Sequence, residues 1–366
     1  MHFDIAYLPG DGIGPEICAE AARVLRAVES KFGHEFTLRE GLIGGAAIDA
    51  TGVALTDETF DMARRCDAIL FGAVGGPKWD DIGGKVPSNR GLFRLRKELQ
   101  LYANLRIVKM LPPLVDSTPL KRETVEGVDL ILIRELIGGL YFAEPRRQWT
   151  DAEGRKAMDT MAYSEAEIAR VVRAGFELAR TRRKKLTSAD KSNVLHTSSL
   201  WRKVATEVSR EYPDVELQHM FVDACALELL RNPRSFDVLV MDNTFGDILS
   251  DEASVLAGSL GMIPSASLSG APGGRTFGLY EPIHGTAPSL AGKDVANPLA
   301  TILSAALLLR YSLELTREAT AVEEAVVTVL EQGYRTADVA EKGKMIIGTR
   351  EMGERVATMV AGGAAA

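Results

Sequence analysis

The amino-acid sequence predicts an α/β fold that is divided into two domains. Short apolar runs, typical of buried strands, alternate with longer amphipathic segments that indicate helices. The chain has 366 residues, which is too long for one small core and suits two domains. Because no Ser/Pro-rich linker separates two halves, we expect the domains to share strands or the chain to cross between them more than once.

The first predicted elements are a strand, a glycine-rich turn and a helix. An apolar strand over 3–8 leads into a Gly/Pro turn and then into a helix over 15–29. The glycines of the turn are Gly10, Gly12 and Gly14, which do not have the G-x-G-x-x-G spacing of a dinucleotide-binding fingerprint. No acidic residue ends a second strand about 20 residues further on. The sequence therefore argues against a Rossmann fold.

Further strands and helices follow along the chain. Buried strands are expected over 67–74, 128–134, 217–222 and 236–241. Helices are expected after a capping box over 164–167, over 200–212 and over 299–309, and the segment 243–254 is expected to start a helix. The helix that the capping box opens ends in the basic run 180–185, where the helix dipole favours cations. This run is therefore better explained as a helix end than as a nucleic-acid patch.

Composition and charge argue against several classes of partner. Hydrophobic content of 46% with 25% charged residues is ordinary for a globular enzyme, and a net charge of −7 disfavours nucleic acid and anionic membranes. The longest apolar stretch, 299–309, has about half the length of a membrane span. Cys18, Cys66 and Cys225 show no metal-type spacing, and the apolar N-terminus is too short for a signal peptide. We expect a cytoplasmic enzyme with reduced thiols.

Two carboxylates in the segment 243–254 indicate a cation site. Asp247 and Asp251 stand four residues apart, so on a helix they lie on one face and reach the same point. Oxygen ligands of this kind suit a hard divalent cation with open positions for substrate. The alternative is a solvated acidic helix start that the helix dipole favours.

Three arginines indicate an anionic substrate. Arg96 and Arg106 flank the segment 95–106, and Arg134 ends a predicted buried strand, where α/β proteins bind ligands. Arginine holds carboxylates through a bidentate fork, so the three together suit a dicarboxylate. Each one alone is more often part of a surface ion pair.

Three other polar features are candidates for chemistry. Tyr141 follows two glycines and could serve as a general acid, or it could simply pack in a turn. Lys191 lies in a short polar break and could serve as a general base if its pKa is depressed, although exposed lysines are usually solvated. The long loop 280–298 contains a histidine, glycines and a helix start, which can bind phosphate and adenine.

In this order, these segments resemble the family of β-decarboxylating dehydrogenases, which act on 3-isopropylmalate, isocitrate, homoisocitrate or tartrate. The characteristic motifs are Asn-x-x-Gly-Asp-x-x-Ser-Asp over 243–251 and Glu-Pro-x-His-Gly over 281–285. The resemblance implies a two-domain fold with a central mixed sheet that is not a Rossmann fold. Its first domain would comprise 1–101 and 258–366, and its second 102–257. It also implies a homodimer with shared active sites.

The resemblance also implies roles for individual residues. Asp247 and Asp251, with the partner subunit's Asp223, would bind Mg²⁺ or Mn²⁺. The substrate carboxylates would be held by Arg96, Arg106 and Arg134. The partner subunit's Lys191 would accept the hydroxyl proton, and Tyr141 would protonate the enol carbon. The substrate side chain would face Leu92, Phe93 and the partner subunit's Val194, and the partner subunit's Asp223 would also contact the substrate. NAD would be bound by Glu281, His284, Gly285, Ser289 and Asn297.

Sequence details favour one branch of this family. The segments Leu-Arg-Lys, Tyr-Ala-Asn-Leu-Arg and Gly-Ser-Leu-Gly-Met-x-Pro-Ser-Ala look closest to the members that oxidatively decarboxylate 3-isopropylmalate to 2-oxoisocaproate in leucine biosynthesis. Three positions depart from the usual pattern. Ser289 replaces the aspartate of NAD-using members, Asn89 replaces a glutamate, and Ile107 replaces a proline. NAD is still favoured, because no cation at 289–290 awaits a 2′-phosphate.

Two other functions remain open from the sequence. A sister enzyme of the same family would act on isocitrate, homoisocitrate, malate or tartrate instead. A catalytically silent regulatory subunit would bind ligand without turnover. The apolar pair Leu92-Phe93 argues against the first alternative, and the intact set of candidate catalytic residues argues against the second.

Overall fold

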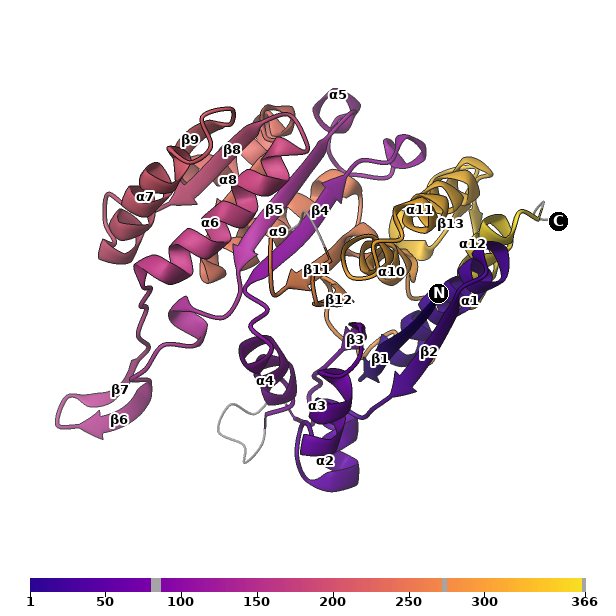
Figure 1. Cartoon of the computed structure of the whole chain (residues 1–366), viewed down its shortest axis with the longest axis horizontal. Helices are drawn as coiled ribbons and strands as arrows, with labels where there is room; N and C mark the ends of the chain where they lie inside the picture. The colour runs from indigo at the N-terminus through magenta and orange to yellow at the C-terminus, as the bar shows by residue number, and fades with distance from the viewer. Residues whose placement is uncertain (80–86, 272–274, 364–366) are drawn as a thin grey trace.

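The computed structural model describes residues 1–79, 87–271 and 275–363 and has one large β-sheet flanked by helices (Figure 1). Ten strands form this sheet in the order β2-β1-β3-β12-β11-β4-β5-β10-β8-β9. β11 runs antiparallel to β12 and β4, β4 runs antiparallel to β5, and the remaining pairs are parallel. The expected mixed sheet is confirmed, and its strand order is not that of a Rossmann fold.

One half of the sheet combines strands from both ends of the chain. Its strands are β1 (His2–Gly10), β2 (Glu35–Glu40), β3 (Ala68–Ala73), β11 (Pro264–Leu268) and β12 (Gly278–Pro282). Its helices are α1 (Gly14–Phe32), α2 (Gly45–Thr51), α3 (Asp57–Ala63), α4 (Arg90–Glu98), α10 (Leu299–Tyr311), α11 (Thr316–Glu331) and α12 (Thr349–Ala361). α1 packs against α12, so the beginning and the end of the described chain lie side by side (Figure 1).

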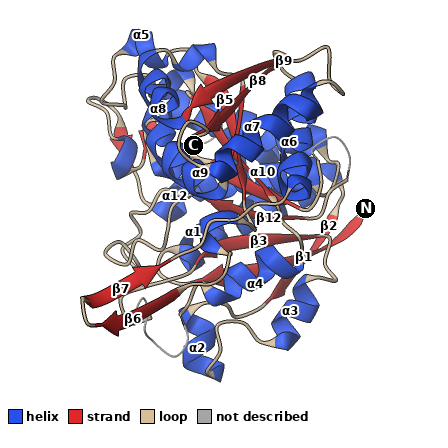
Figure 2. Ribbon diagram, turned by 90° about the vertical axis from the view of Figure 1, so that its left-hand side faces the viewer, coloured by secondary structure: helices blue, strands red, loops and turns tan. Residues whose placement is uncertain are grey.

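The middle of the chain forms the other half of the sheet. Its strands are β4 (Ala103–Lys109), β5 (Asp129–Glu135), β8 (Lys185–Asp190), β9 (Glu216–Phe221) and β10 (Val238–Met241). Its helices are α5 (Arg122–Val125), α6 (Glu165–Arg180), α7 (His196–Ser209), α8 (Val222–Arg231) and α9 (Asn243–Ser254). A separate hairpin, β6 (Arg147–Asp151) and β7 (Gly154–Met158), projects from the body of the molecule (Figures 1 and 2). A short pair, β13 (Tyr334–Arg335) and β14 (Met345–Ile346), lies near the C-terminus.

Local sequence signals explain several helix boundaries. α1 has proline in its first turn and ends where Gly33 adopts a left-handed φ of 72°. α6 begins with the expected capping box, in which Ser164 and Glu167 exchange hydrogen bonds between side chain and backbone. α9 begins at Asn243, in the segment expected to start a helix, because Asp242 caps it by accepting a hydrogen bond from the backbone N–H of Phe245.

Some boundaries differ from the expected ones. α1 continues to Phe32, and α7 begins at His196 and ends at Ser209 instead of covering 200–212. The basic run after α6 does more than complement a helix dipole. The guanidinium of Arg182 donates to Asp129 and Asp237, and it thereby connects the end of α6 to the strands of the sheet.

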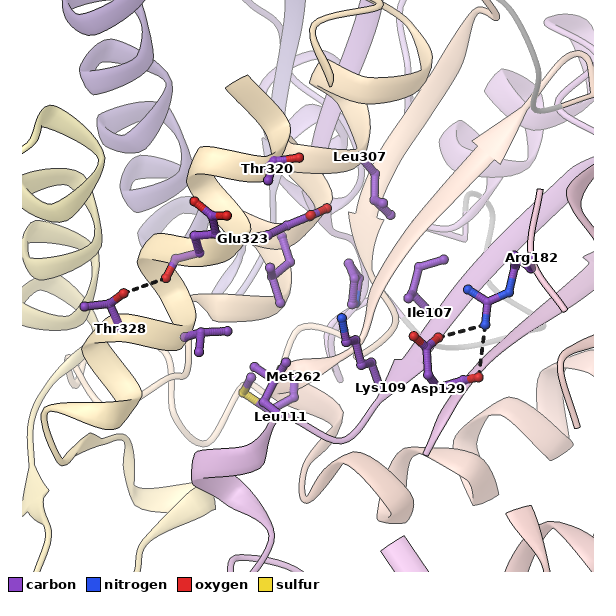
Figure 3. A pocket seen from close by; sticks show the side chains of 14 residues that line it. Ile107, Lys109, Leu111, Asp129, Arg182, Met262, Leu307, Thr320, Glu323 and Thr328 are labelled. Carbon is purple, nitrogen blue, oxygen red and sulfur yellow. Dashed lines mark hydrogen bonds and ion pairs between the residues drawn. The ribbon is translucent and has the colours of Figure 1, made fainter. Parts of the chain in front are cut away.

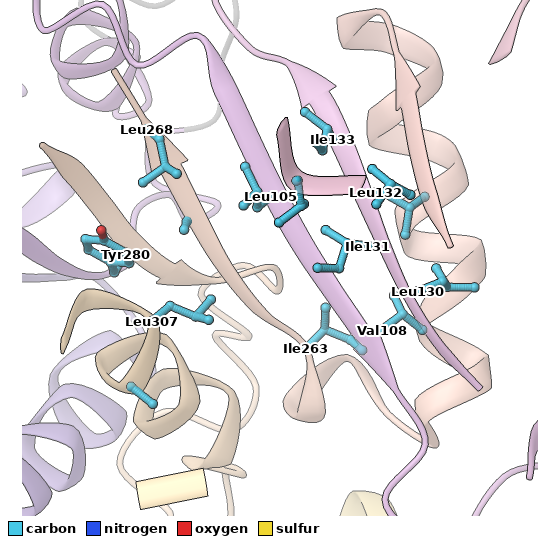
Figure 4. Close-up of a cluster of buried hydrophobic side chains, with 14 of the residues drawn as sticks. Leu105, Val108, Leu130, Ile131, Leu132, Ile133, Ile263, Leu268, Tyr280 and Leu307 are labelled. Carbon is cyan, nitrogen blue, oxygen red and sulfur yellow. The ribbon is translucent and has the colours of Figure 1, made fainter. Parts of the chain in front are cut away.

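The core of the molecule lies against the central strands. Residues of β4, β5, β11, β12 and α10 form one buried cluster around Leu105, Ile131, Leu268 and Leu307 (Figure 4). β3 is buried along its whole length, which explains its continuous apolar run. α10 is buried on nearly every face, which accounts for its uniform apolar sequence. Among the described helices, none is long and apolar enough to cross a membrane.

Candidate active site

A cavity of about 230 Å³ brings together residues that are far apart in the sequence. Its walls come from α4, β4, β5, α9, β12 and the loop that follows β12. The cavity contains ten of the sequence-predicted residues: Leu92, Phe93, Arg96, Arg106, Arg134, Tyr141, Asp247, Glu281, His284 and Gly285. The order of the strands explains this meeting, because β11 and β12 enter the sheet between β3 and β4.

Asp247 is the centre of a cluster with two other candidate residues. One of its carboxylate oxygens accepts a hydrogen bond from Arg134, and the other accepts one from the Tyr141 hydroxyl at 3.1 Å. Burial lowers the pKa of the Arg134 guanidinium, with a further contribution from the positive charge of Arg106. Burial raises the pKa of Tyr141, and the charge of Asp247 adds to this effect. The phenol is therefore held in its protonated form, in which it can donate a proton.

Arg106 connects the two predicted metal ligands. Its guanidinium lies 3.4 Å from the Asp247 carboxylate and 3.3 Å from the Asp251 carboxylate. It also donates to Ser250 Oγ at 2.5 Å and to Asn104 Oδ1 at 3.0 Å. Because Arg106 is buried, these four acceptors compensate for the loss of its hydration.

Arg96 lines the same cavity and pairs with a residue predicted for the cofactor site. Its Nη2 lies 2.7 Å from Glu281 Oε1, and both side chains are largely buried. The buried Nε of Arg96 has no hydrogen-bond partner among the described residues. A buried donor without a partner is costly, so the cavity is suited to a ligand that supplies an acceptor at this point.

One wall of the cavity is apolar. Leu92 is buried, and the Phe93 ring packs edge-on against Phe142 with 5.4 Å between centroids. Both Leu92 and Phe93 lie on α4, about one turn before Arg96. The wall can therefore contact an uncharged part of a ligand whose charged groups reach the arginines.

The loop after β12 contributes a histidine with a defined tautomer. His284 Nδ1 lies 2.9 Å from the carbonyl oxygen of Gly285, so Nδ1 carries the proton when the ring is neutral. Burial lowers the pKa of His284 and favours this neutral form. The buried Nε2 is then an acceptor without a partner among the described residues. Gly285 is exposed, and a Cβ at this position would meet no atom within 4 Å.

Three sequence-predicted residues lie away from this cavity. Lys191 follows β8 and donates to Asp223 at the start of α8, with 2.5 Å between Nζ and Oδ1. This hydrogen bond lowers the pKa of the Asp223 carboxyl. Val194 is 67% exposed. None of the three lines the cavity formed by the described residues of the same chain.

The remaining two cofactor candidates lie beyond the cavity, on the loop 283–298. Ser289 is exposed. Asn297 is buried, donates from Nδ2 to Asp338 Oδ2 at 3.0 Å, and accepts from the backbone N–H of Leu299 at 2.9 Å. Asn297 therefore holds the start of α10 in place.

The carboxylates fit part of a metal site. Asp247 and Asp251 are 38% and 61% exposed, lie one turn apart on α9, and offer hard oxygen ligands. Among the described residues of one chain, no group of three His, Cys, Asp or Glu side chains could hold a metal ion. The described residues of one chain thus offer two carboxylate ligands at this place.

Three supporting residues lie within the sequence motifs but were not predicted to have a role of their own. Asn243 accepts from Arg134 Nε at 2.9 Å and donates to the carbonyl oxygen of Gly138 at 3.0 Å, so it orients an arginine and a loop at once. Asn104 and Ser250 orient Arg106. A signal was present for Asn104, because it stands two residues before Arg106 and shares its face of the strand.

The fold and this cavity are those of a known class of oxidoreductases. The model of the isocitrate/isopropylmalate dehydrogenase family matches residues 4–356. The chain belongs to this family, and it is accordingly a β-decarboxylating dehydrogenase.

Individual relatives refine the comparison. The chain is 55% identical over 362 residues to a 3-isopropylmalate dehydrogenase of Carboxydothermus hydrogenoformans, covering 99% of this chain and 96% of the relative. It is 53% identical over 354 residues to a 3-isopropylmalate dehydrogenase of Aquifex aeolicus, covering 97% of this chain and 96% of the relative. The structure resembles an isocitrate dehydrogenase of Methylococcus capsulatus with a TM-score of 0.86 and 34% identity, covering 99% and 100% of the two chains.

Proposed function

We propose that the chain oxidatively decarboxylates (2R,3S)-3-isopropylmalate to 2-oxoisocaproate and CO₂ with NAD, as a step of leucine biosynthesis. The observation that carries this proposal is a cavity lined by three arginines, Arg96, Arg106 and Arg134, and also by the apolar side chains of Leu92 and Phe93. A dicarboxylate with an apolar branch complements both kinds of lining. The names of the relatives, at 53–55% identity over nearly the whole chain, support the same substrate.

The residues divide the reaction among them. The arginines hold the two carboxylates and orient C2 toward the nicotinamide. As a hydride leaves C2 for NAD, the partner subunit's Lys191 accepts the hydroxyl proton. The bond between C3 and its carboxylate then breaks, CO₂ leaves, and the electron pair remains in an enolate. Tyr141 donates its proton to C3 of this enolate, which gives 2-oxoisocaproate.

A divalent cation, Mg²⁺ or Mn²⁺, fits beside this cavity. Asp247 and Asp251 would hold it, with the partner subunit's Asp223 as the third carboxylate. When bound, the cation supplies Lewis-acid polarisation of the substrate oxygen. Arg106 and Arg134, which now share Asp247, would then turn to the substrate carboxylates.

A homodimer would complete the site. α8 and α9 pack side by side and present large apolar side chains to solvent, with Leu227 54% and Ile248 62% exposed. Apolar surface of this kind supports a subunit interface. Asp223 lies at the start of α8, and Lys191 pairs with Asp223. A second copy packed on this surface would therefore bring its own Lys191 and Asp223 toward the cavity.

The nucleotide would lie along the loop after β12. Glu281, His284, Gly285 and Asn297 would contact NAD, and Ser289 would face its adenosine ribose. The unpartnered Nε2 of His284 supports a ligand in this position. Ser289 offers no positive charge to a 2′-phosphate, which supports NAD over NADP.

We also propose two domains, 1–101 with 258–366 and 102–257, and a cytoplasmic location. The strand order, in which both ends of the chain share one half of the sheet, supports this division. Three buried cysteines without a disulfide support a reducing compartment.

Steady-state NAD reduction by the purified chain with Mg²⁺ tests the proposal. We expect 3-isopropylmalate to give a kcat/KM far above those of isocitrate, homoisocitrate, malate and tartrate, and NAD to exceed NADP. A preference for another acid would reassign the substrate to a sister activity of the family. Substrate binding that depends on metal but gives no turnover would favour a regulatory subunit.

A further inference from the structure

A second and larger cavity, of about 670 Å³, is named the rear cavity here, and the candidate active site the front cavity; Figure 3 shows the side chains that line the rear cavity. The alternation of side chains along two strands separates the two cavities. On β4, Arg106 lines the front cavity and its neighbour Ile107 lines the rear one. On β11, Ser265 lines the front cavity and Pro264 the rear one. Because successive residues of a strand point to opposite faces, the rear cavity lies on the other face of the same sheet.

The floor of the rear cavity is apolar. Leu303 and Leu307 of α10, Met262 and Leu111 line it together with Ile107. Its volume lies within the range of roughly 300–1,000 Å³ that is usual for small-molecule sites. An apolar floor of this size suits the hydrocarbon part of a small ligand.

Two charged pairs at the rim are already satisfied. Arg182 donates to Asp129 at 2.8 Å and to Asp237 at 2.7 Å. Glu323 of α11 pairs with Arg310 at 2.8 Å. These groups are neutralised by protein partners, so they offer little net charge to a ligand.

Two further charges at the rim are free. Lys109 ends the strand wall, and its ammonium has no hydrogen bond or ion pair with any described residue. Glu324 stands on the helix wall, on α11, and its carboxylate is likewise unpaired among the described residues. Figure 3 shows Lys109 directed from the strand side and α11 facing it from the opposite side of the cavity. A ligand that complements this rim carries both a carboxylate and an ammonium group.

We propose that the rear cavity is a second ligand site, for a zwitterionic amino compound with an apolar side chain. Lys109 binds its carboxylate, Glu324 binds its ammonium group, and the side chain packs on the floor around Ile107 and Leu307. Free amino acids and short peptides share this chemistry. The site is independent of the substrate cavity, because its residues lie on the opposite face of the sheet.

Isothermal titration of the purified full-length protein tests this site. The probes are leucine and the dipeptide leucyl-leucine, compared with 4-methylpentanoate, which lacks the ammonium group, and leucinamide, which lacks the carboxylate. We expect one zwitterion to bind per chain, and each truncated probe to bind about tenfold more weakly, the effect of losing one hydrogen bond to a charged group. Whichever of leucine and leucyl-leucine binds more tightly shows whether the ligand is a free amino acid or a short peptide.

Substitutions of residues that line the rear cavity show whether the ligand binds there. We expect Lys109→Met and Glu324→Gln each to weaken binding about tenfold, since each removes one charged contact. Ile107→Trp fills the cavity and should abolish binding. The control Lys121→Met removes an exposed lysine outside the cavity and should leave binding unchanged. No binding by either zwitterion, equal binding to Lys109→Met, or equal binding of 4-methylpentanoate would overturn the proposal.

Discussion

Arg96 and Glu281 form an ion pair of 2.7 Å although 185 residues separate them in the chain. Arg96 comes from α4 and Glu281 from β12, so the pair joins the predicted substrate clamp to the predicted cofactor site. Its two members are largely buried, and a buried charge that loses its partner is destabilised. We therefore expect binding of substrate and binding of nucleotide to be linked through this contact.

Replacing Arg96 should impair substrate binding. Arg96→Met removes a charge-assisted hydrogen bond to a carboxylate, which is worth about 1.5–3 kcal/mol, so kcat/KM for 3-isopropylmalate should fall roughly 10- to 150-fold. Steady-state kinetics measures the loss. Lys97→Met, on the exposed neighbouring position of α4, is the matched control and should stay close to the unmodified chain. A normal KM in Arg96→Met would show that Arg96 does not hold a substrate carboxylate.

Tyr141 should be needed for turnover but not for binding. Tyr141→Phe keeps the ring that stacks near Arg134 and removes only the hydroxyl that contacts Asp247. We expect kcat to fall by about 10²- to 10⁴-fold, the usual contribution of a general acid. Calorimetry should show that substrate affinity changes little. Unchanged turnover would assign the proton donation to another group.

Shared active sites predict complementation between two inactive variants. Lys191→Ala and Asp247→Asn should each be inactive as homodimers, because each removes a group that every site needs. In a mixed dimer, one site combines an intact Asp247 with an intact Lys191 from the partner. Random reassociation should therefore restore about a quarter of the activity of the unmodified protein. No activity after subunit exchange, verified by differently tagged chains, would mean that each site is built within one chain.

The raised pKa of Glu135 predicts that the free energy of unfolding depends on pH. Burial raises its pKa from the ordinary value to about 7, although the backbone N–H groups of Ile137 and Gly138 partly oppose this shift. A raised pKa means that ionisation is less favourable in the folded state than in the unfolded state. The contribution of Glu135 to stability is therefore complete at acid pH, below its unfolded pKa, and is lost as pH rises through about 7.

Denaturant unfolding at several pH values checks whether the stability contributed by Glu135 is lost as pH rises. Glu135→Gln cannot ionise, so its stability relative to the unmodified chain should improve by about 3 kcal/mol between pH 5 and pH 8. The comparison cancels contributions from other buried carboxyls. A constant difference across this range would show that the Glu135 carboxyl has an ordinary pKa.

Local features of the fold were predictable, and long-range pairing was not. The start of α9 and the capping box of α6 follow from neighbouring residues, so the sequence indicated both. The pairing of Arg96 with Glu281 depends on β11 and β12 entering the sheet beside β3, which no local pattern specifies. The rear cavity also depends on how α10 and α11 cover the sheet.

The strand order has a consequence for synthesis of the chain. β3 and β4 are finished by Lys109, but the strands that join them, β11 and β12, span 264–282. A growing chain therefore carries two half-sheets whose facing edges stay unpaired while more than a hundred further residues are made. The free backbone N–H and C=O groups of an unpaired edge strand can form hydrogen bonds with strands of other chains. We therefore expect these edges to need protection until the last central strand, β12, has left the ribosome.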